Sequence, residues 1–388
     1  MPIKNRFADL LPEITEWRRD LHEHPEILFE THRTAAIVAD KLREFGCDEV
    51  VTGIARTGVV GIIRGKADTS GRTVGLRADM DALPIEEATG VPYASKTPGA
   101  MHACGHDGHT AMLLGAAKYL AETGNFDGTV AVIFQPAEEG GGGGQLMVDE
   151  GVFDRFAIDE VYGMHNQPNL DIGAFRIRPG AFYASADIFD ITVTGQGGHA
   201  AKPHEVIDPI LVASHIVVAL QSIVARNLHP DDKCVVSITA FEPDNDAYNV
   251  IAQTVTLRGT VRTMTPATRD LAEARLGQIA RSTAQAFGAT AEVAYTRKYP
   301  AMVNSETETD YAAAAARAVS GDCDTDAKIT MGGEDFACML EVRPGAYIEV
   351  GNGPGAGVHH PEYNFNDEAI PHGCSYWATL VEQRLPAA

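Results

Sequence analysis

The chain has 388 residues, of which 45% are hydrophobic, and its formal net charge is −22. This length suggests two domains or one large one, and the apolar share is ordinary for a folded globular protein. The acidic excess repels nucleic acid and anionic membranes, so neither is expected as a partner. No apolar run approaches the roughly 20 residues of a membrane span, and the first residues lack a signal-peptide core, so a cytoplasmic location is the default expectation.

The sequence up to residue 183 alternates between helical and strand patterns. Apolar spacing predicts two helices within residues 11–45, interrupted at Pro25. The next elements are predicted strands at 58–63, 73–77, 129–134 and 160–164, with a helix at 110–122. Several of these strands run into acidic or histidine residues. The order favours an α/β domain with a mixed, largely parallel central sheet flanked by helices and a site at the carboxyl ends of its strands.

From about residue 184 the pattern changes to strand, helix, strand, strand, helix, strand, which is the order of a ferredoxin-like α+β unit. The predicted strands are 187–193, 234–240, 254–261 and 290–299, and the helices are 208–225 and 268–287. We therefore expect a domain of residues 184–297 inserted into one formed by 1–183 plus 298–388. The strand at 187–193 is considered as an open sheet edge that a partner subunit could cover. Helix and strand patterns then return, with a last helix from about Ile370.

The stretch Met101–His109 is the densest group of possible metal ligands, because it holds three histidines, one cysteine and one aspartate. Cys104 and His106 are two residues apart, and Gly105 between them gives the backbone the freedom to bring both to one metal. The other five cysteines are scattered and are expected to be reduced thiols. The density of donors beside Cys104 favours a metal site over a loop that binds nothing.

Four separated groups of donors follow apolar runs, and they are Cys104 with His106, the pair Glu138 and Glu139, His165, and His359. Thiolate, imidazole and carboxylate ligands suit zinc, or manganese, cobalt or nickel. Five ligands are too many for one tetrahedral ion, but they are enough for two ions that share a ligand. One of the two adjacent glutamates can then bind metal while the other acts as a general base.

Other chemistries fit the sequence less well. The glycines at 140–144 are not followed by Gly-Lys-Ser/Thr, so a P-loop is excluded, and no Gly-x-Ser-x-Gly nucleophile elbow is present. Cys104 as a catalytic nucleophile, with His106 or His109 as its base, stays open.

Seven motifs, taken together and in order, resemble the co-catalytic metallopeptidase family of aminoacylases, hippurate hydrolases and glutamate carboxypeptidases. The hippurate hydrolase and auxin-conjugate amidohydrolase branch is the most similar. The motifs span almost the whole chain and are Arg18-Arg-Asp-Leu-His-Glu-His-Pro-Glu, Leu76-Arg-Ala-Asp-Met-Asp-Ala-Leu-Pro-Ile, His102-Ala-Cys-Gly-His-Asp-Gly-His, Phe134-Gln-Pro-Ala-Glu-Glu-Gly, Gly163-Met-His-Asn, Met331-Gly-Gly-Glu-Asp-Phe and His359-His-Pro-Glu-Tyr.

This resemblance implies a zinc-peptidase-like catalytic domain with two divalent metal ions in each subunit. Cys104 would bridge the ions, with Glu139 and His359 completing one site and His106 and His165 the other. Glu138 would be the general base, and Asp81 would orient a ligand histidine. His102 and His109 would have supporting roles rather than bind metal.

The resemblance also implies roles for the inserted domain, as a lid and dimerisation domain of a homodimer or higher homo-oligomer. His199 would reach a neighbouring active site and stabilise the developing oxyanion, while Asn249 and Arg262 would contact the substrate, with Arg262 facing its carboxylate.

The implied reaction is hydrolysis of a small N-acyl amino acid, hippurate-like or N-acetylated, to a carboxylate and a free amino acid. Three alternatives stay open: a dipeptidase or carboxypeptidase of the same family, a non-catalytic protein that binds metal or amino acids, and a thiol-dependent amidase. The acyl group and the native metal are also left open.

Overall fold

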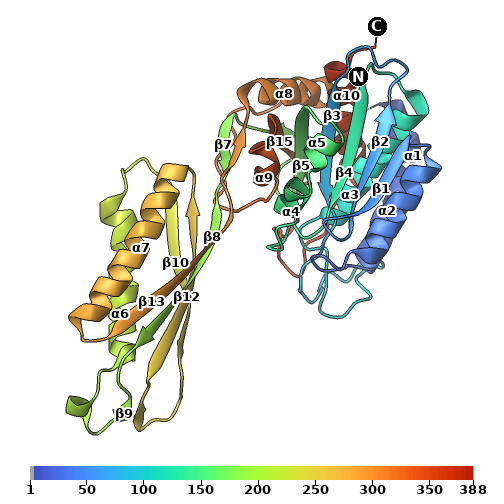
Figure 1. Ribbon diagram of the computed structural model, residues 1–388. Helices are drawn as coiled ribbons and strands as arrows, with labels where there is room; N and C mark the ends of the chain where they lie inside the picture. The colour runs from blue at the N-terminus through green and yellow to red at the C-terminus, as the bar shows by residue number, and fades with distance from the viewer. Residues whose placement is uncertain (1–3, 388) are drawn as a thin grey trace. The chain divides into compact units, whose positions relative to one another are not determined.

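A computed structural model describes residues 4–387, which fold into two compact units (Figure 1). The first unit holds the chain up to Phe182, Val303–Lys328, and the chain from Asp335 onward. The second unit holds Tyr183–Met302 and Ile329–Glu334. The second unit is thus formed mainly by one long insertion into the first.

The first unit is built on a seven-stranded sheet with the order β1-β2-β4-β3-β5-β15-β6. The four strands β4, β3, β5 and β15 run parallel to one another, whereas β1, β2 and β6 are antiparallel to their neighbours. The predicted mixed, largely parallel sheet is therefore confirmed. The strands are β1 (Glu49–Ile54), β2 (Gly58–Arg64), β3 (Thr73–Asp79), β4 (Thr129–Gln135), β5 (Glu160–Gln167), β6 (Phe175–Arg176) and β15 (Gly345–Gly351).

Helices cover both faces of this sheet (Figure 1). One face carries α2 (His32–Glu44), α3 (His106–Thr123), α8 (Glu306–Ser320) and α10 (Ile370–Arg384), with α1 (Asn5–Glu23) packed on α3 and α10. The other face carries α4 (Gly143–Asp149), α5 (Val152–Arg155) and α9 (Ala337–Leu340). Because both faces are covered, β3 and β15 are buried along their whole length, which explains their apolar sequences. None of the helices within residues 4–387 is long and apolar enough to cross a membrane.

Two local features differ from the sequence-based expectation. Helix α3 begins at His106, one turn earlier than predicted, because Gly105 takes a left-handed conformation (φ 91°) and turns the chain directly into the helix. Strand β1 was not predicted, since its side chains are mostly half-buried or exposed and lack a strong alternating pattern. It is held in the sheet by its hairpin with β2.

The second unit has a four-stranded antiparallel sheet with the order β10-β12-β8-β13 and two main helices. Its elements are β8 (Ala186–Thr194), α6 (Pro209–Leu220), a short π-helix (Ile223–Asn227), β10 (Cys234–Pro243), β12 (Thr254–Thr263), α7 (Pro266–Ala286) and β13 (Thr290–Tyr299). This is the predicted order of elements. A small two-stranded sheet pairs β9 (Gly198–His199) with β11 (Val250–Ile251), and another pairs β7 (Gly180–Tyr183) with β14 (Met302–Asn304).

The expectation that 187–193 forms an open edge is wrong. This strand, β8, lies between β12 and β13 and pairs with both along most of its length. Strand β8 is central because the two strand-helix-strand halves of the unit interleave in the sheet. The sequence of a single strand does not reveal this order. The edges of the sheet are β10 and β13.

Candidate metal centre

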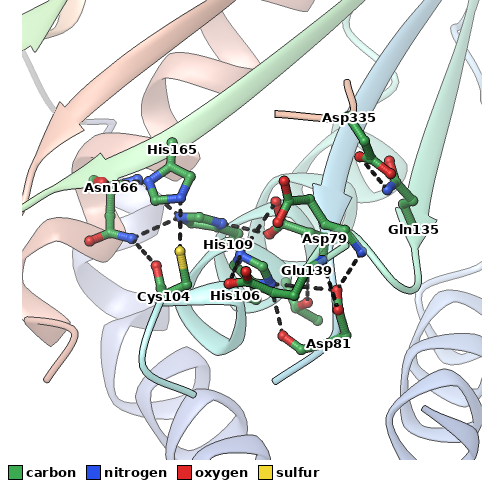
Figure 2. A network of polar contacts seen from close by, with 12 residues as sticks. Asp79, Asp81, Cys104, His106, His109, Gln135, Glu139, His165, Asn166 and Asp335 are labelled. Carbon is green, nitrogen blue, oxygen red and sulfur yellow. Dashed lines mark hydrogen bonds and ion pairs between the residues drawn. The ribbon is translucent and has the colours of Figure 1, made fainter. Parts of the chain in front are cut away.

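The carboxyl ends of three neighbouring parallel strands bring the donor residues of the first unit together (Figure 2). Asp79 ends β3, and Asp81 follows two residues later. Glu138 and Glu139 lie just beyond β4, and His165 lies near the end of β5. Parallel strands end at the same edge of a sheet, so residues far apart in sequence meet there.

The turn at Gly105 places Cys104 and His106 next to each other at this edge. A Cβ atom at Gly105 would collide with the Asn166 amide and the Tyr363 hydroxyl. These two groups hold the turn, since Asn166 Nδ2 donates to the Cys104 carbonyl (2.6 Å) and the Tyr363 hydroxyl donates to Asn166 Oδ1 (2.7 Å). Glycine is therefore required both by the backbone angle and by the lack of space.

The predicted ligands form two groups of three that share Cys104. One is Cys104, His106 and His165, and the other is Cys104, Glu139 and His359. Within each group the donor atoms lie within 4.8 Å of one another. The Cys104 sulfur lies 3.3 Å from His165 Nε2, and Glu139 Oε1 lies 3.2 Å from His359 Nε2.

His359 comes from a different part of the chain and has a strained backbone. Its φ is 64°, a left-handed value that side-chain-bearing residues seldom adopt. Its N–H donates to the Ala103 carbonyl (2.7 Å), which ties it to the residue before Cys104. Strain of this kind is held in place by surrounding contacts and is common at functional sites.

The chemistry of these donors fits divalent cations. Burial opposes charging of His106, but Asp79, Asp81 and Glu139 outweigh it and raise its pKa to about 10, so this position favours positive charge. Its Nε2 is buried and has no hydrogen-bond partner among the described residues. Burial, followed by Glu139 and Glu138, raises the pKa of the Cys104 thiol well above its usual range, so a thiolate here needs a nearby cation.

His165 has the protonation state that a metal ligand needs. Burial lowers its pKa to about 3, so the imidazole is neutral near pH 7. Its Nδ1 donates to the Asn166 carbonyl (2.6 Å), which leaves the lone pair of Nε2 facing Cys104.

Asp81 organises the loop that carries the two glutamates. Its carboxylate accepts hydrogen bonds from the backbone N–H groups of Glu138 (2.9 Å) and Glu139 (3.1 Å). His106 Nδ1 donates to the Asp81 carbonyl oxygen (2.8 Å) and lies 3.6 Å from its carboxylate. Glu138 is buried, and its carboxylate lies within 4.8 Å of the donor atoms of His106 and Glu139. The general-base candidate is therefore held beside the ligand groups.

The other two histidines of the stretch differ in their contacts. His109 Nδ1 donates to Asp79 Oδ1 (2.6 Å), and its Nε2 accepts the Asn166 N–H (2.9 Å). His102 is buried and makes no side-chain hydrogen bond among the described residues, and burial lowers its pKa to about 3. Neither belongs to the two groups that share Cys104.

The three candidate residues of the second unit do not all lie together. His199 pairs with Val250 across the β9–β11 ladder, and the Asn249 carbonyl accepts the Ala200 N–H (3.0 Å), so His199 and Asn249 are neighbours. His199 is exposed. Arg262 lies near the C-terminal end of β12, whereas Asn249 precedes the N-terminal end of that strand. The Arg262 guanidinium donates to the Val261 carbonyl (3.2 Å) and to the Thr260 hydroxyl.

The sequence analysis missed a buried network beneath the site. Arg77 is fully buried and donates to Asp79 Oδ2 (2.6 Å), Gln135 Oε1 (2.9 Å) and Asp335 Oδ1 (3.1 Å). Asp335 also accepts the Gly144 N–H (2.7 Å). Burial raises the pKa of Asp79, but His106, His109 and Arg77 together hold it well below its usual range. An arginine inside an otherwise apolar strand was the signal available in the sequence.

An open α/β sheet whose carboxyl edge carries two donor groups that share Cys104 can hold two metal ions. Comparison with known proteins places the chain in a family. Residues 75–383 match the model of peptidase family M20/M25/M40. The chain is 42% identical over 381 residues to the hippurate hydrolase of Campylobacter jejuni, covering 98% of both. It is 38% identical to the N-acetylcysteine deacetylase of Bacillus subtilis, covering 94% of both.

Among solved structures, the YXEP protein of Bacillus subtilis, described as a dinuclear metal-binding peptidase, superposes with a TM-score of 0.85. The two sequences are 34% identical, and the superposition covers 98% of this chain and 100% of the YXEP chain. The chain therefore belongs to peptidase family M20/M25/M40, and the predicted family is confirmed. The protein is a hydrolase, and the expected fold is confirmed by the same comparison.

Proposed function

We propose that this protein hydrolyses N-acyl amino acids to a carboxylate and a free amino acid, using two divalent metal ions. The observation that carries the proposal is the pair of donor groups that share Cys104, with the buried Glu138 carboxylate beside them. The similarity to a hippurate hydrolase and an N-acetylcysteine deacetylase supports this class of substrate.

In the proposed reaction the first metal-binding group is Cys104, Glu139 and His359, and the second is Cys104, His106 and His165. Bound cations would polarise the amide carbonyl and lower the pKa of a water molecule. Glu138 takes the proton of the attacking water and later gives it to the leaving amine. Asp81 keeps Glu138 and Glu139 in place through their backbone N–H groups and orients His106.

The test is Glu138→Gln, which keeps the size of the side chain and removes the base. We expect kcat to fall by about 10²–10⁴-fold while the metal content per chain stays at the wild-type value. The assay uses N-benzoyl, N-acetyl and longer-chain N-acyl amino acids alongside dipeptides and C-terminally extended peptides. A variant with near wild-type kcat contradicts the role of Glu138, and a clear preference for peptides favours the dipeptidase or carboxypeptidase alternative.

Metal removal separates this mechanism from a thiol-dependent amidase. Thorough chelation should abolish hydrolysis, and separate reconstitution with Zn²⁺, Mn²⁺, Co²⁺ and Ni²⁺ should restore it to different extents. We propose one of these four ions as the native metal, because Cys104 is a soft ligand while His and Glu are compatible with all four. Activity that survives chelation supports Cys104 as a nucleophile.

We also propose that the second unit forms a homodimer with its copy in another chain. Helix α6 is apolar on two sides: Val212, Ile216 and Leu220 are buried, whereas Leu211 is 50% and Val218 is 72% exposed. A helix that is hydrophobic on its exposed side is expected to be covered by a partner. The open edge of β10 offers further pairing. Val218→Lys should shift the mass in solution from dimer to monomer, whereas Arg43→Glu, an exposed charge change on α2 of the first unit, should not.

His199 is proposed to serve the active site of the partner chain by stabilising the developing oxyanion, with Asn249 beside it contacting substrate. Arg262 is proposed to bind the substrate carboxylate. Mixing inactive His199→Ala with inactive Glu138→Gln should restore about a quarter to a half of the wild-type activity if His199 acts across subunits. No recovery in mixed dimers contradicts this arrangement.

A further inference from the structure

The His109 side chain lies between the two histidines proposed to bind the same ion. Its ring centroid is 5.5 Å from that of His106, at 30°, and 4.6 Å from that of His165, at 67°. The rings of His106 and His165 themselves are 6.2 Å apart and nearly perpendicular. His109 therefore contacts both imidazoles, and Figure 2 shows it between them.

Both nitrogens of His109 are already used. Nδ1 donates to Asp79 Oδ1 (2.6 Å), and Nε2 accepts the backbone N–H of Asn166 (2.9 Å). In this pattern the Nδ1 proton points at Asp79 and the Nε2 lone pair faces the Asn166 N–H. Asp79, His106 and His109 do offer donor atoms within 4.8 Å of one another, but His109 keeps no free lone pair for a metal.

Asp79 is held in turn by Arg77, which lies two residues earlier on the same strand, β3. Its Oδ2 accepts from Arg77 (2.6 Å), which also contacts Asp335 (3.1 Å). Asp79, Arg77, Asp335 and His109 are each at most 2% exposed, so this chain of contacts is shielded from water. It ends at Asn166, the residue after His165, whose carbonyl orients the His165 ring.

We infer that Asp79 and His109 form a positioning pair, in which His109 sets the separation and orientation of His106 and His165 without binding metal itself. The inference rests on the proposed metal function and deepens it, because it assigns residues that control one of the two ion sites. In the described part of the chain His109 contacts Asp79, Asn166, His106 and His165 rather than Glu139 or His359, so we expect the affinity for the other ion to be insensitive to His109.

The experiment is a titration of the metal-free full-length protein with Co²⁺, followed by visible absorption, which reports coordination independently of hydrolysis. His109→Asn keeps a short donor for Asp79 but loses the ring and the acceptor for Asn166. We expect about 10–100-fold weaker affinity for one of the two Co²⁺ ions, a changed absorption band for that ion, and unchanged affinity for the other. His372→Asn is the control, because it removes another partly buried imidazole, on α10, and should leave both affinities unchanged.

Asp79→Asn is the second variant and keeps the His109 ring in place. Asp79→Asn should weaken the affinity for the same Co²⁺ ion, by a smaller factor than His109→Asn. It therefore keeps the test decisive if His109→Asn does not fold. Unchanged affinities in both variants overturn the inference. Loss of one whole equivalent of Co²⁺ at saturation also overturns it, since His109 would then be a ligand. If the wild type binds two Co²⁺ ions but hydrolyses no N-acyl amino acid, the proposed function fails, while the variants still test the positioning pair.

Discussion

Two polar clusters, both largely buried, meet at the start of α3, and they differ in how their charges are balanced. The first is the donor cluster of Cys104, His106, Glu139, His165 and His359. The second, which we call the ion-pair cluster, consists of Arg18, His22, Glu87 and Asp107. His106 belongs to the donor cluster, and the next residue, Asp107, belongs to the ion-pair cluster.

The ion-pair cluster satisfies its own charges. Asp107 Oδ2 lies 2.8 Å from both Arg18 Nε and His22 Nδ1, and Glu87 Oε1 lies 3.3 Å from His22 Nε2. Burial raises the pKa of Asp107, but Arg18 and His22 outweigh it and hold that pKa far below its usual range. Two basic groups thus face two carboxylates, so the charges of this cluster balance, although Arg18 Nε, Arg18 Nη1 and Asp107 Oδ1 have no hydrogen-bond partner among the described residues.

The donor cluster is short of positive charge. Asp79, Asp81, Glu138 and Glu139 surround it, and Asp79 is paired with Arg77 and His109. The donor atoms of this cluster face one another. His106 Nε2, for example, is buried and has no hydrogen-bond partner among the described residues. The comparison teaches that buried charge alone does not identify a metal site, whereas buried donors that converge without a cation do.

The largest effect should come from Cys104→Ala, because Cys104 is common to both donor groups. We expect metal content well below the wild-type value and a fall in kcat/KM on the order of 10³-fold or more, as several kcal/mol of metal-dependent stabilisation are lost. Elemental analysis and initial rates measure the two effects. Cys374→Ala, which removes a buried thiol from α10, is the control and should keep its metal. Full metal content in Cys104→Ala contradicts the shared-ligand assignment.

Asp107→Asn should break the ion-pair cluster and leave the buried Arg18 without the nearer of its charged partners, since Asp367 lies 3.5 Å from it and Asp107 lies 2.8 Å from it. We expect a loss of about 3–5 kcal/mol in the free energy of unfolding, measured with urea on the metal-free protein. Asp40→Asn, at an exposed pair with Arg43, should change it by less than about 1 kcal/mol. A small loss in Asp107→Asn would show that the two clusters do not differ as described.

The same variant predicts a pH dependence with a defined sign. The pKa of Asp107 is lower in the folded than in the unfolded protein, so its contribution is fully present above the unfolded value of about 3.9 and is lost as pH falls toward the folded value. The part of the difference in unfolding free energy between wild type and Asp107→Asn that comes from the Asp107 carboxyl should thus shrink below about pH 4, whereas changes nearer neutral pH reflect His22, whose pKa Asp107 raises. A difference that grows as pH falls below about 4 contradicts this prediction.

The smallest effect on the metal-free protein should come from Glu139→Gln. Removing one carboxylate from a cluster that lacks positive charge should change the free energy of unfolding by less than about 1 kcal/mol. Metal at 100 times its dissociation constant should stabilise the wild type by about 2.7 kcal/mol per site, and the variant by clearly less. Thermal unfolding with and without Zn²⁺ measures both. A large destabilisation of the metal-free variant means that Glu139 is a structural residue like Asp107.

Much of the fold and of the candidate site could be predicted because the evidence is local or carried by motifs. Ile14, Trp17 and Leu21 are buried on one face of α1, as their spacing predicts, and the apolar runs at 58–63 and 129–134 are strands. The central position of β8 could not be predicted, because strand order depends on partners 60 or more residues away. The role of Arg77 was missed for the same reason, since its contacts with Asp79, Gln135 and Asp335 join three separate segments.

The sequence by itself determined the family, the sequence of helices and strands, and the types of donor atoms available, since these depend on local spacing and on motifs. Only the tertiary structure decided how those donors combine. It places Cys104 in both groups of three, uses both nitrogens of His109 in hydrogen bonds, and pairs Asp107 with Arg18 one residue from His106. The physical reason is that ligand and ion-pair residues differ in which atoms face them, and that is set by strands and helices brought together from distant parts of the chain.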